Sequence, residues 1–597
     1  MDRNTVTGLI LMLFVMIAWA YFTMPTEEEL RQRQAERVRQ DSIAAAQADT
    51  RGRQLQRSVP DQAEELMPEI RQDEEEHQPM GMFSAASVAD TSFVTIETPL
   101  YQATFTNVGA GPAQIVLKEF KTWDQRPVQM IEDTTQSAYS IGFLTNENYN
   151  VETDGLVFEQ LTPEKTITLE EGDTRQLQYA LTISEQQQII YTYTLRGDSY
   201  QMDLDVEFIG LDRNIIGGTI DFGWEPRLNL TEKDRSQEGV LTSAFVYTGG
   251  ELDQLNLDGS GRNEQNYNGQ VDWVATRTRF FTQIIKSENP TEGARLVGEV
   301  TGLSDGSAQT DHHYKSYLQL GVPDNNVANF RLYVGPLSYE TLKVFDHHAY
   351  DMVDTGYALL RWFSDPLVRY VIIPFFSFAG DYMNYGVAII IFAILIKLLL
   401  FPLTKKSYKS MAAMKELQPK MQEIQEKYKD NPQKQQEATL KLYKKSGVNP
   451  LGGCLPNLLQ LPILITLWRY FQDSILLRQQ EFLWANDLSA PDYILSLPFS
   501  IPFLGDQIAG FVLLMTGAMF VQSNLTGGMG TPGGSGPAAG QMAALKYIFP
   551  FMLLFIFNNF AAGLSLYYLV YNVVSILQQL MINRQLDQEK EMAAAAS

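Results

Sequence analysis

The chain has 597 residues, a formal net charge of −24 and one cysteine. The length predicts several domains, and the lone Cys454 excludes a disulfide within the chain. Residues 25–345 hold 26 Lys and Arg against 51 Asp and Glu, so nearly all of the excess acid lies in one block. Such a block would repel phosphate, so we expect no direct binding of nucleic acid. We interpret Cys454, beside an apolar run, as a buried structural thiol.

The first predicted element is a transmembrane anchor at residues 1–24, because Val6–Met24 is long enough to cross a bilayer. The alternative is a cleaved signal peptide. Against it, the apolar core is long, and the small residues around Ala18 and Ala20 are followed by bulky Tyr21 and Phe22. Residues 25–90 are rich in Gln, Glu, Arg and Ala, which is typical of a charged, solvated linker.

Residues 91–345 have the pattern of an all-β sandwich domain. Met202–Phe208 alternates strictly between apolar and polar residues, and a turn at Arg196–Asp198 separates it from the run Ile189–Leu195. Three further runs alternate in the same way: Phe93–Glu97, Ala103–Asn107 and Gln114–Phe120. We therefore expect a sandwich of many antiparallel strands.

The remainder of the chain is membrane-like. In residues 350–380, apolar residues recur at helical spacing while Arg361, Asp365 and Arg369 share a polar side, which predicts an amphipathic helix in the membrane interface, bent by Pro366 and Pro374. Residues 381–585 form a predicted five-helix core. Its apolar spans lie at about 384–403, 455–472, 507–522, 547–560 and 562–581. With the anchor this makes six transmembrane helices, followed by a tail at 586–597.

The distribution of lysine predicts the orientation. Residues 404–447 hold eleven lysines and five acids, whereas residues 473–506 hold one basic residue and five acids. By the positive-inside rule the first segment is cytoplasmic and the second is outside. Counting spans in both directions places the β domain outside and both termini in the cytoplasm.

The lysine-rich segment 404–447 is predicted to be a cytoplasmic helical hairpin. A Met-rich apolar stripe runs from Tyr408 to Tyr428 at spacings of three or four, and Asp430-Asn431-Pro432 interrupts it. The stripe could bind varied apolar partners, or it could only pack the hairpin together, and the pattern does not separate these alternatives.

Lys397 is the most unusual residue of the predicted core. Ten apolar residues precede it and four follow it, with no acid within seven residues. A charge at that depth costs about 3 kcal/mol. One alternative is that Lys397 snorkels to the nearby cytoplasmic face. The other is that it faces a water-filled cavity inside the bundle, which would make it a functional group.

Other polar residues fall at matching depths in the predicted spans. Asn457 and Gln460 share one helical face, Ser565 and Asn572 share another, and Asn558 and Asn559 interrupt the fifth core span. Hydrogen bonds between helices explain any one of them as well as a groove does. The predicted groove set is Lys397, Asn457, Gln460, Asn559, Ser565 and Asn572.

No motif for catalysis or cofactor binding is present. The paired histidines lack the helical i,i+4 metal spacing, and the glycine-rich run Gly527–Gly540 lacks the lysine of a phosphate loop. We therefore expect no enzymatic activity, no cofactor and no metal site.

Several motifs resemble one family. They are Asn449–Pro456 (NPLGGCLP), Gln460–Pro462, Phe401–Thr404, Leu417–Pro419 and Gly563–Tyr568 (GLSLYY), and their order and spacing are similar to those of the YidC membrane protein insertases. The resemblance is strong over about 355–585 and weaker in the β domain. It implies a hydrophilic groove open to the cytoplasm and to lipid, and it implies nascent membrane proteins, the ribosome and the Sec translocon as partners.

The family resemblance also implies an arginine in the groove and a threonine one turn earlier, where this sequence has Lys397 and Ala393. We therefore expect the groove to need the charge and to dispense with the bidentate guanidinium. The membrane proteins being inserted, called clients below, would leave the groove along an apolar surface on the third and sixth spans. Its predicted residues are Leu461, Ile463, Leu464, Leu467, Tyr567 and Tyr568.

Two other functions are compatible with the pattern. The first is a secondary transporter with Lys397 as its ion or substrate site, although neither inverted repeats nor paired broken helices are apparent. The second is an assembly factor in which the β domain is the active part and the spans are anchors. The family resemblance favours the insertase, which inserts, folds and helps to assemble inner-membrane proteins.

Overall fold

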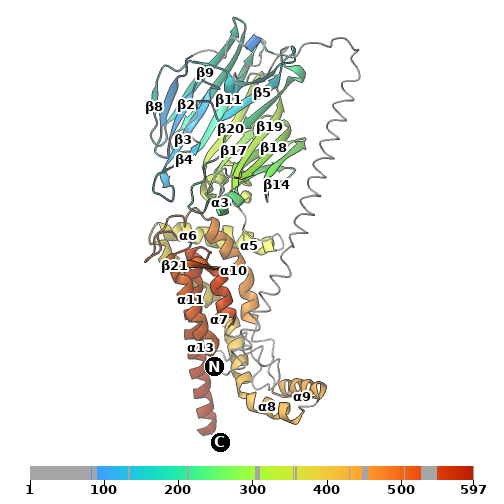
Figure 1. Cartoon of the computed structure of the whole chain (residues 1–597), viewed down its shortest axis with the longest axis vertical. Helices are drawn as coiled ribbons and strands as arrows, with labels where there is room; N and C mark the ends of the chain where they lie inside the picture. The colour runs from blue at the N-terminus through green and yellow to red at the C-terminus, as the bar shows by residue number, and fades with distance from the viewer. Residues whose placement is uncertain are drawn as a thin grey trace.

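The computed structural model describes residues 82–83 and 90–595, apart from 132–134, 212–213, 258, 303–309, 354, 357–359, 429–430, 447–454, 503 and 526–547. The predicted anchor at 1–24, most of the linker at 25–90 and Cys454 lie outside the described residues. The described chain forms a β domain stacked end to end on a bundle of helices (Figure 1).

The β domain alternates in the way its sequence predicts. Met202–Phe208 lies within strand β11, and its apolar side chains point into the core while the polar ones between them do not. The strands are β1 (Phe93–Glu97), β2 (Tyr101–Thr106), β3 (Gly111–Lys121), β4 (Pro127–Ile131), β5 (Tyr139–Leu144), β6 (Asn150–Glu152), β7 (Glu159–Gln160), β8 (Thr166–Thr168), β9 (Thr174–Ser184), β10 (Gln187–Arg196), β11 (Gln201–Ile209), β12 (Thr219–Trp224), β13 (Ser243–Thr248), β14 (Glu251–Leu255), β15 (Gly261–Asn268), β16 (Val271–Arg277), β17 (Phe281–Ser287), β18 (Thr291–Gly302), β19 (Thr310–Gly321) and β20 (Val327–Pro336).

The strands form three sheets, ordered β4-β3-β2-β1-β8, β14-β13-β16-β17-β20-β11-β10-β9-β7 and β15-β18-β19-β12-β5-β6. The predicted hairpin is confirmed, because β10 and β11 pair antiparallel with Tyr191 opposite Val206. The expectation of antiparallel pairing is wrong at β1, which pairs with β8 in parallel. Side chains such as Trp224, Trp273 and Tyr333 fill the space between the sheets, so burial of apolar surface holds this domain together without a disulfide.

The helical region follows the predicted apolar spans. Its main helices are α7 (Tyr385–Glu416), α8 (Gln418–Lys427), α9 (Pro432–Lys445), α10 (Leu455–Asp473), α11 (Gly510–Leu525), the helix Ile548–Phe557, and α13 (Ala562–Ala595). Two stretches in these helices, Tyr385–Lys405 and Ala562–Glu589, are both long and apolar enough to cross a bilayer. The apolar helices Gly510–Leu525 and Ile548–Phe557 are shorter.

Helix α7 continues beyond its predicted end at 403. It runs to Glu416 with Pro402 inside it, so the first arm of the predicted hairpin at 404–447 is the same helix. No glycine lies between Thr404 and Glu416, and lysine, methionine and alanine there favour continuation. The second arm begins as predicted, since the side chain of Asn431 caps α9 by accepting from the Lys434 N–H at 3.1 Å.

The predicted span at 507–522 begins too early. Residues Gly505–Ala509 form strand β22, which pairs with β21 (Tyr493–Ile501), and α11 starts only at Gly510. The carboxylate of Asp492 accepts from the Phe511 N–H at 2.7 Å and from the Trp484 indole at 2.8 Å. This cap fixes the start of α11, because it satisfies a donor that the first turn leaves free.

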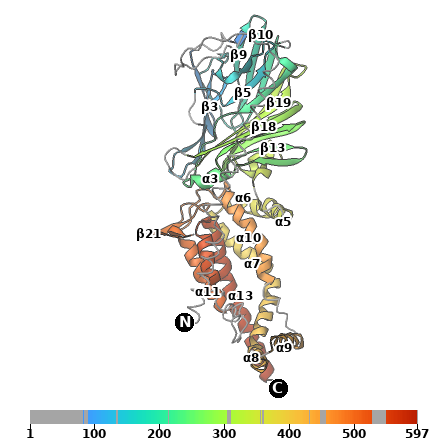
Figure 2. The ribbon, with the colours of Figure 1, turned by 45° about the vertical axis from the view of Figure 1, so that its right-hand side comes forward.

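The predicted interfacial helix is present but divided. It consists of α5 (Arg361–Leu367), the π-turn η6 (Val368–Ile372) and α6 (Ile373–Gly380). Pro366 and Pro374 lie within or beside the breaks, as expected for residues that cannot continue the hydrogen-bond ladder. In both views this segment lies between the sheets and the bundle (Figures 1 and 2).

Two buried arginines join the β domain to the helices. Arg478, after α10, forms an ion pair of 2.7 Å with Glu232 and donates to the carbonyl of Lys121. Arg279, between β16 and β17, donates to the carbonyls of Gln472 and Ser489. The short helix α3 (Arg235–Leu241) lies at this junction (Figure 2). The two regions are therefore held in register by hydrogen-bonded charges.

Candidate functional site

Lys397 lies inside the helical bundle. Its α7 neighbours Leu398 and Leu399 are 58% and 72% exposed, whereas Lys397 itself is 1% exposed. Helix α7 therefore has an outer apolar face and an inner face that carries the ammonium. The snorkelling alternative is not what the structure shows, because the charge points into the bundle and not to its surface.

The ammonium of Lys397 rests on an aromatic ring. Its Nζ lies 3.6 Å from the centroid of Tyr571 on α13, well within the range of a cation–π contact. Lys397 has no hydrogen bond or ion pair with any residue that the structure describes. A cation–π contact stabilises a desolvated ammonium by about 2 kcal/mol, which is less than the roughly 3 kcal/mol that burial costs.

Buried polar side chains continue along the helices from this point. Asn572 donates to the Tyr568 carbonyl at 2.7 Å, and the Ser575 hydroxyl donates to the Tyr571 carbonyl at 2.7 Å. The side chains of Thr404 and Ser407 on α7 are also buried. Sequence reasoning found Asn572 but missed Tyr571, Thr404, Ser407 and Ser575. Thr404 is seven residues from Lys397 and Ser575 is three from Asn572, so helical spacing was the available signal for these two, whereas Tyr571 and Ser407 have no such spacing to a predicted groove residue.

Two other predicted groove residues, Gln460 and Ser565, are buried inside the bundle. The Gln460 amide donates to the Tyr567 hydroxyl at 3.3 Å, while its Oε1 has no partner among the described residues. The hydroxyl of Ser565 is buried and also has none there. Asn457 lies in α10, and its side chain falls outside the described part of the chain. Unsatisfied buried polar atoms are rare in folded proteins and mark places where water or a ligand can bind.

Asn559 is not brought to Lys397. Its side chain accepts from the Tyr493 hydroxyl at 3.0 Å on β21. The adjacent Asn558 donates to the carbonyls of Leu504 and Gln507 and accepts from the Ala509 N–H. Both asparagines therefore hold the β21–β22 hairpin against the end of the bundle. Two adjacent asparagines at a helix end can form hydrogen bonds to the backbone of a loop as readily as they can line a groove. The sequence alone does not distinguish these two roles.

The predicted apolar client surface is mostly interior. Leu461 is 48% exposed and Leu464 is partly buried, but Ile463, Leu467, Tyr567 and Tyr568 are 0–9% exposed. The Tyr567 and Tyr568 rings pack on Tyr571, with centroids 6.1 and 6.0 Å away. Four of the six residues are thus core side chains in this conformation, because α10 and α13 pack their apolar faces together.

The hairpin shows part of its apolar stripe packed. Leu417 and Met421 are buried, and the Tyr443 hydroxyl of α9 donates to the Met421 sulfur at 3.3 Å. The side chains of Tyr408, Met411 and Met414 lie outside the described residues. At Leu417 and Met421 the stripe therefore packs the hairpin itself.

A β sandwich seated on a bundle of apolar helices, with a cation enclosed in that bundle, defines a multi-helix membrane protein with a large domain outside the bilayer. Two family models match it: the "YidC periplasmic domain" at residues 93–370 and the "60Kd inner membrane protein" at residues 376–590. The chain belongs to the YidC family of membrane protein insertases, which is not a family of catalytic enzymes.

Similar proteins extend over the whole chain. A membrane protein insertase YidC of Chlorobium limicola is 37% identical over 98% of this chain and 95% of its own length. The corresponding protein of Chlorobaculum tepidum is 35% identical over 100% and 97%. A galactose mutarotase related enzyme from Lactobacillus acidophilus covers 40% of this chain and 97% of its own length, with a TM-score of 0.26 and 10% identity, which is too distant to bear on function.

Proposed function

We propose that this chain inserts and folds proteins of the bacterial inner membrane through a groove between α7, α10 and α13, with Lys397 as its electrostatic anchor. Six helices cross the bilayer: the 1–24 anchor and the five-helix core at 381–585. The β domain at 91–345 lies in the periplasm, joined to the anchor by the 25–90 linker and to the core by the interfacial segment 350–380. Both termini and the hairpin at 404–447 are cytoplasmic.

The observation that carries this proposal is the buried ammonium of Lys397 with a ring in place of a carboxylate. A carboxylate in a client's polar tail is a better partner than the Tyr571 ring, because a charge-assisted hydrogen bond is stronger than a cation–π contact. The arriving carboxylate therefore displaces the ring. Tyr571 keeps the ammonium in place between clients and releases it when a client arrives.

The polar side chains beyond Lys397 extend this path. Thr404, Ser407 and Ser575 are buried at 2%, 3% and 0% exposure, and their hydroxyls offer a translocating polar segment hydrogen bonds that lipid cannot supply. The polar segment of the client then crosses a shorter thickness of apolar membrane. Partition of the client's apolar segment into lipid drives the last step, and no nucleotide is needed.

The exit of the client requires the helices to move apart. Leu461 is accessible at once, whereas Leu467 and Tyr567 are fully buried. We infer that the client first contacts Leu461 and that separation of α10 from α13 then exposes the remaining predicted surface. Ribosome and Sec translocon are the partners we propose, on the basis of family resemblance alone.

The decisive experiment compares Lys397→Ala, Lys397→Arg and the control Lys405→Ala in proteoliposomes. We expect Lys397→Ala to slow insertion of a client with an acidic tail by at least about tenfold, the loss of one charge-assisted bond. Lys397→Arg and Lys405→Ala should retain activity, and a client with a neutral tail should insert equally in all variants. Full insertion of the acidic client by Lys397→Ala would refute the electrostatic role.

Two further measurements separate the alternative functions. Uptake of a small solute by vesicles that contain only this chain would favour a secondary transporter with Lys397 at its ion site. Deletion of residues 91–340 with the helices kept would abolish insertion if the β domain were the active part, and would preserve it if the groove were.

A further inference from the structure

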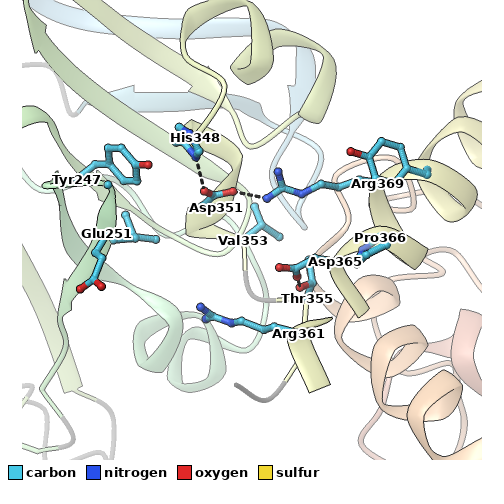
Figure 3. Close-up of a pocket in the computed structure, with 13 residues that line it drawn as sticks. Tyr247, Glu251, His348, Asp351, Val353, Thr355, Arg361, Asp365, Pro366 and Arg369 are labelled. Atoms are coloured by element: carbon cyan, nitrogen blue, oxygen red, sulfur yellow. Dashed lines mark hydrogen bonds and ion pairs between the residues drawn. The ribbon is translucent and has the colours of Figure 1, made fainter. Parts of the chain in front are cut away.

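A second site lies where the interfacial segment meets the β domain. A cavity of about 620 Å³ opens between strand β14 and helix α5, and it is lined by charged and aromatic side chains (Figure 3). Its volume falls in the range of about 300–1,000 Å³ that is typical of small-molecule sites. Arg361, Asp365 and Arg369, the predicted polar side of the amphipathic segment, all face this cavity. The helix therefore turns its polar side to the cavity.

Most charges in this cavity are already paired. Asp351 bridges the His348 ring, at 2.9 Å, and the Arg369 guanidinium (Figure 3). The His348 ring also stacks on Tyr247, with centroids 4.8 Å apart. Asp365 accepts from the Thr355 hydroxyl. These contacts build a rigid wall, because each member has its position fixed by a neighbour.

Two opposite charges are left over. The side chains of Arg361 and Glu251 form no hydrogen bond or ion pair within the described chain, and both are exposed to the cavity. Figure 3 shows the Arg361 guanidinium reaching from α5 toward the strands, on the side where Glu251 lies. With two arginines against the three carboxylates of Glu251, Asp351 and Asp365, the lining is slightly acidic. Such a lining favours a ligand that carries a cation as well as an anion.

The surroundings indicate where this ligand comes from. Trp362 and Tyr370, next to the polar side of the segment, are each 77% exposed. Exposed Trp and Tyr on an amphipathic segment are typical of the level of lipid headgroups. Tyr370 also lines the cavity, so the mouth of the site and the membrane-facing surface share a residue.

We propose that this cavity binds the phosphoethanolamine headgroup of a zwitterionic phospholipid. The Arg361 guanidinium holds the phosphate, and the Glu251 carboxylate holds the ammonium. The acyl chains descend past Tyr370 into the bilayer, so one lipid ties the β domain to the interfacial segment. The placement of this lipid in the periplasmic leaflet rests on the orientation proposed above, while the binding itself does not.

The test is a calorimetric titration of the purified full chain in detergent. The probes are dihexanoyl phosphatidylethanolamine, dihexanoyl phosphatidylglycerol and inorganic phosphate. We expect phosphatidylethanolamine to bind the most tightly of the three. Arg361→Ala and Glu251→Gln should each weaken it by about tenfold, the loss of one charge-assisted bond. The controls Arg175→Ala and Glu171→Gln, at exposed positions around the start of β9, should leave it unchanged.

Three outcomes would overturn the proposal. One is equal binding of phosphatidylethanolamine by Arg361→Ala, Glu251→Gln and the unaltered chain. The second is competition by inorganic phosphate at the same concentration, which would make this a simple anion site. The third is tighter binding of phosphatidylglycerol, which would exclude a role for Glu251. Client insertion is measured separately with the Lys397 variants, so a failure of the groove proposal leaves this titration interpretable.

Discussion

The junction between the two regions and the interior of the bundle each bury a cation, in opposite surroundings. Arg478 is 5% exposed and has an ion pair of 2.7 Å with Glu232 as well as a backbone carbonyl. Lys397 is 1% exposed and has an aromatic ring. A buried charge with a structural role has an opposite charge beside it in the folded protein, because an unpaired buried charge destabilises the fold. The proposed function accounts for the charge of Lys397, which lacks such a pair within the described residues.

The largest effect is expected from breaking the paired cation. Arg478→Ala leaves the Glu232 carboxylate buried without its partner, which destabilises by about 3–5 kcal/mol. Thermal unfolding of the full chain should show a clear loss of stability, with faster amide hydrogen exchange around residues 231–238 and 472–489. The control Arg262→Ala removes an arginine whose side chain is 65% exposed and should change neither readout. An unchanged Arg478→Ala would show that the junction does not depend on this pair.

The same junction predicts a dependence on pH. Burial raises the pKa of Glu238, beside Glu232, from 4.5 to about 7. Because the folded state holds this proton more tightly, its stabilisation is complete below about pH 4.5 and is lost as the pH rises through 7. At 1.36 kcal/mol per pKa unit the loss is about 3 kcal/mol.

Thermal unfolding of the full chain between pH 4.5 and 8 measures this effect. Glu238→Gln carries no titrating group and should flatten the decline. An identical pH profile in the variant would assign the dependence to another group.

A double-mutant cycle tests the ring in the unpaired site. Tyr571→Phe keeps the ring and should preserve stability, whereas Tyr571→Leu should lose about 1–2 kcal/mol of cation–π stabilisation. The difference between the two variants should shrink by this amount in a Lys397→Met background, where only the packing of the ring on Tyr567 and Tyr568 remains. An unchanged difference there would show that the ring stabilises the fold by packing alone and not by holding the ammonium.

The smallest effect has the opposite sign from the first. Lys397→Met removes a charge that costs about 3 kcal/mol and gives up a ring contact of about 2 kcal/mol. We therefore expect the variant to be about 1 kcal/mol more stable in thermal unfolding, while it fails to insert clients with acidic tails. A destabilised Lys397→Met would place Lys397 with Arg478 among the structural charges.

Most of the fold could be predicted from the hydrophobic periodicity of the sequence. The strict alternation of Met202–Phe208 and the apolar run before Lys397 each depend on neighbours in the chain, so the sequence reports them directly. The start of α11 was misplaced because Ile508 and Ala509 of β22 join the apolar helix without a break in hydropathy, and the cap at Asp492 lies 18 residues before Gly510.

The site was only partly predictable. Lys397 stood out because a charge in an apolar run is rare, but its partner Tyr571 lies 174 positions away on another helix. The burial of Leu467 and Tyr567 also depends on how α10 packs against α13, which hydropathy does not contain. His348 looked uninformative in the sequence, yet Asp351 and Tyr247 fix it in the wall of the cavity between β14 and α5.

Pro402 gives α7 a mechanical property. It lies inside a helix that joins the buried ammonium to the lysine-rich first arm of the hairpin, five residues beyond Lys397. Proline donates no amide hydrogen, so the carbonyl of Leu398 lacks its usual partner and the rod is weakened at that level. Pro402 therefore divides α7 into two segments that can tilt relative to each other, one with Lys397 and one that leads into the hairpin.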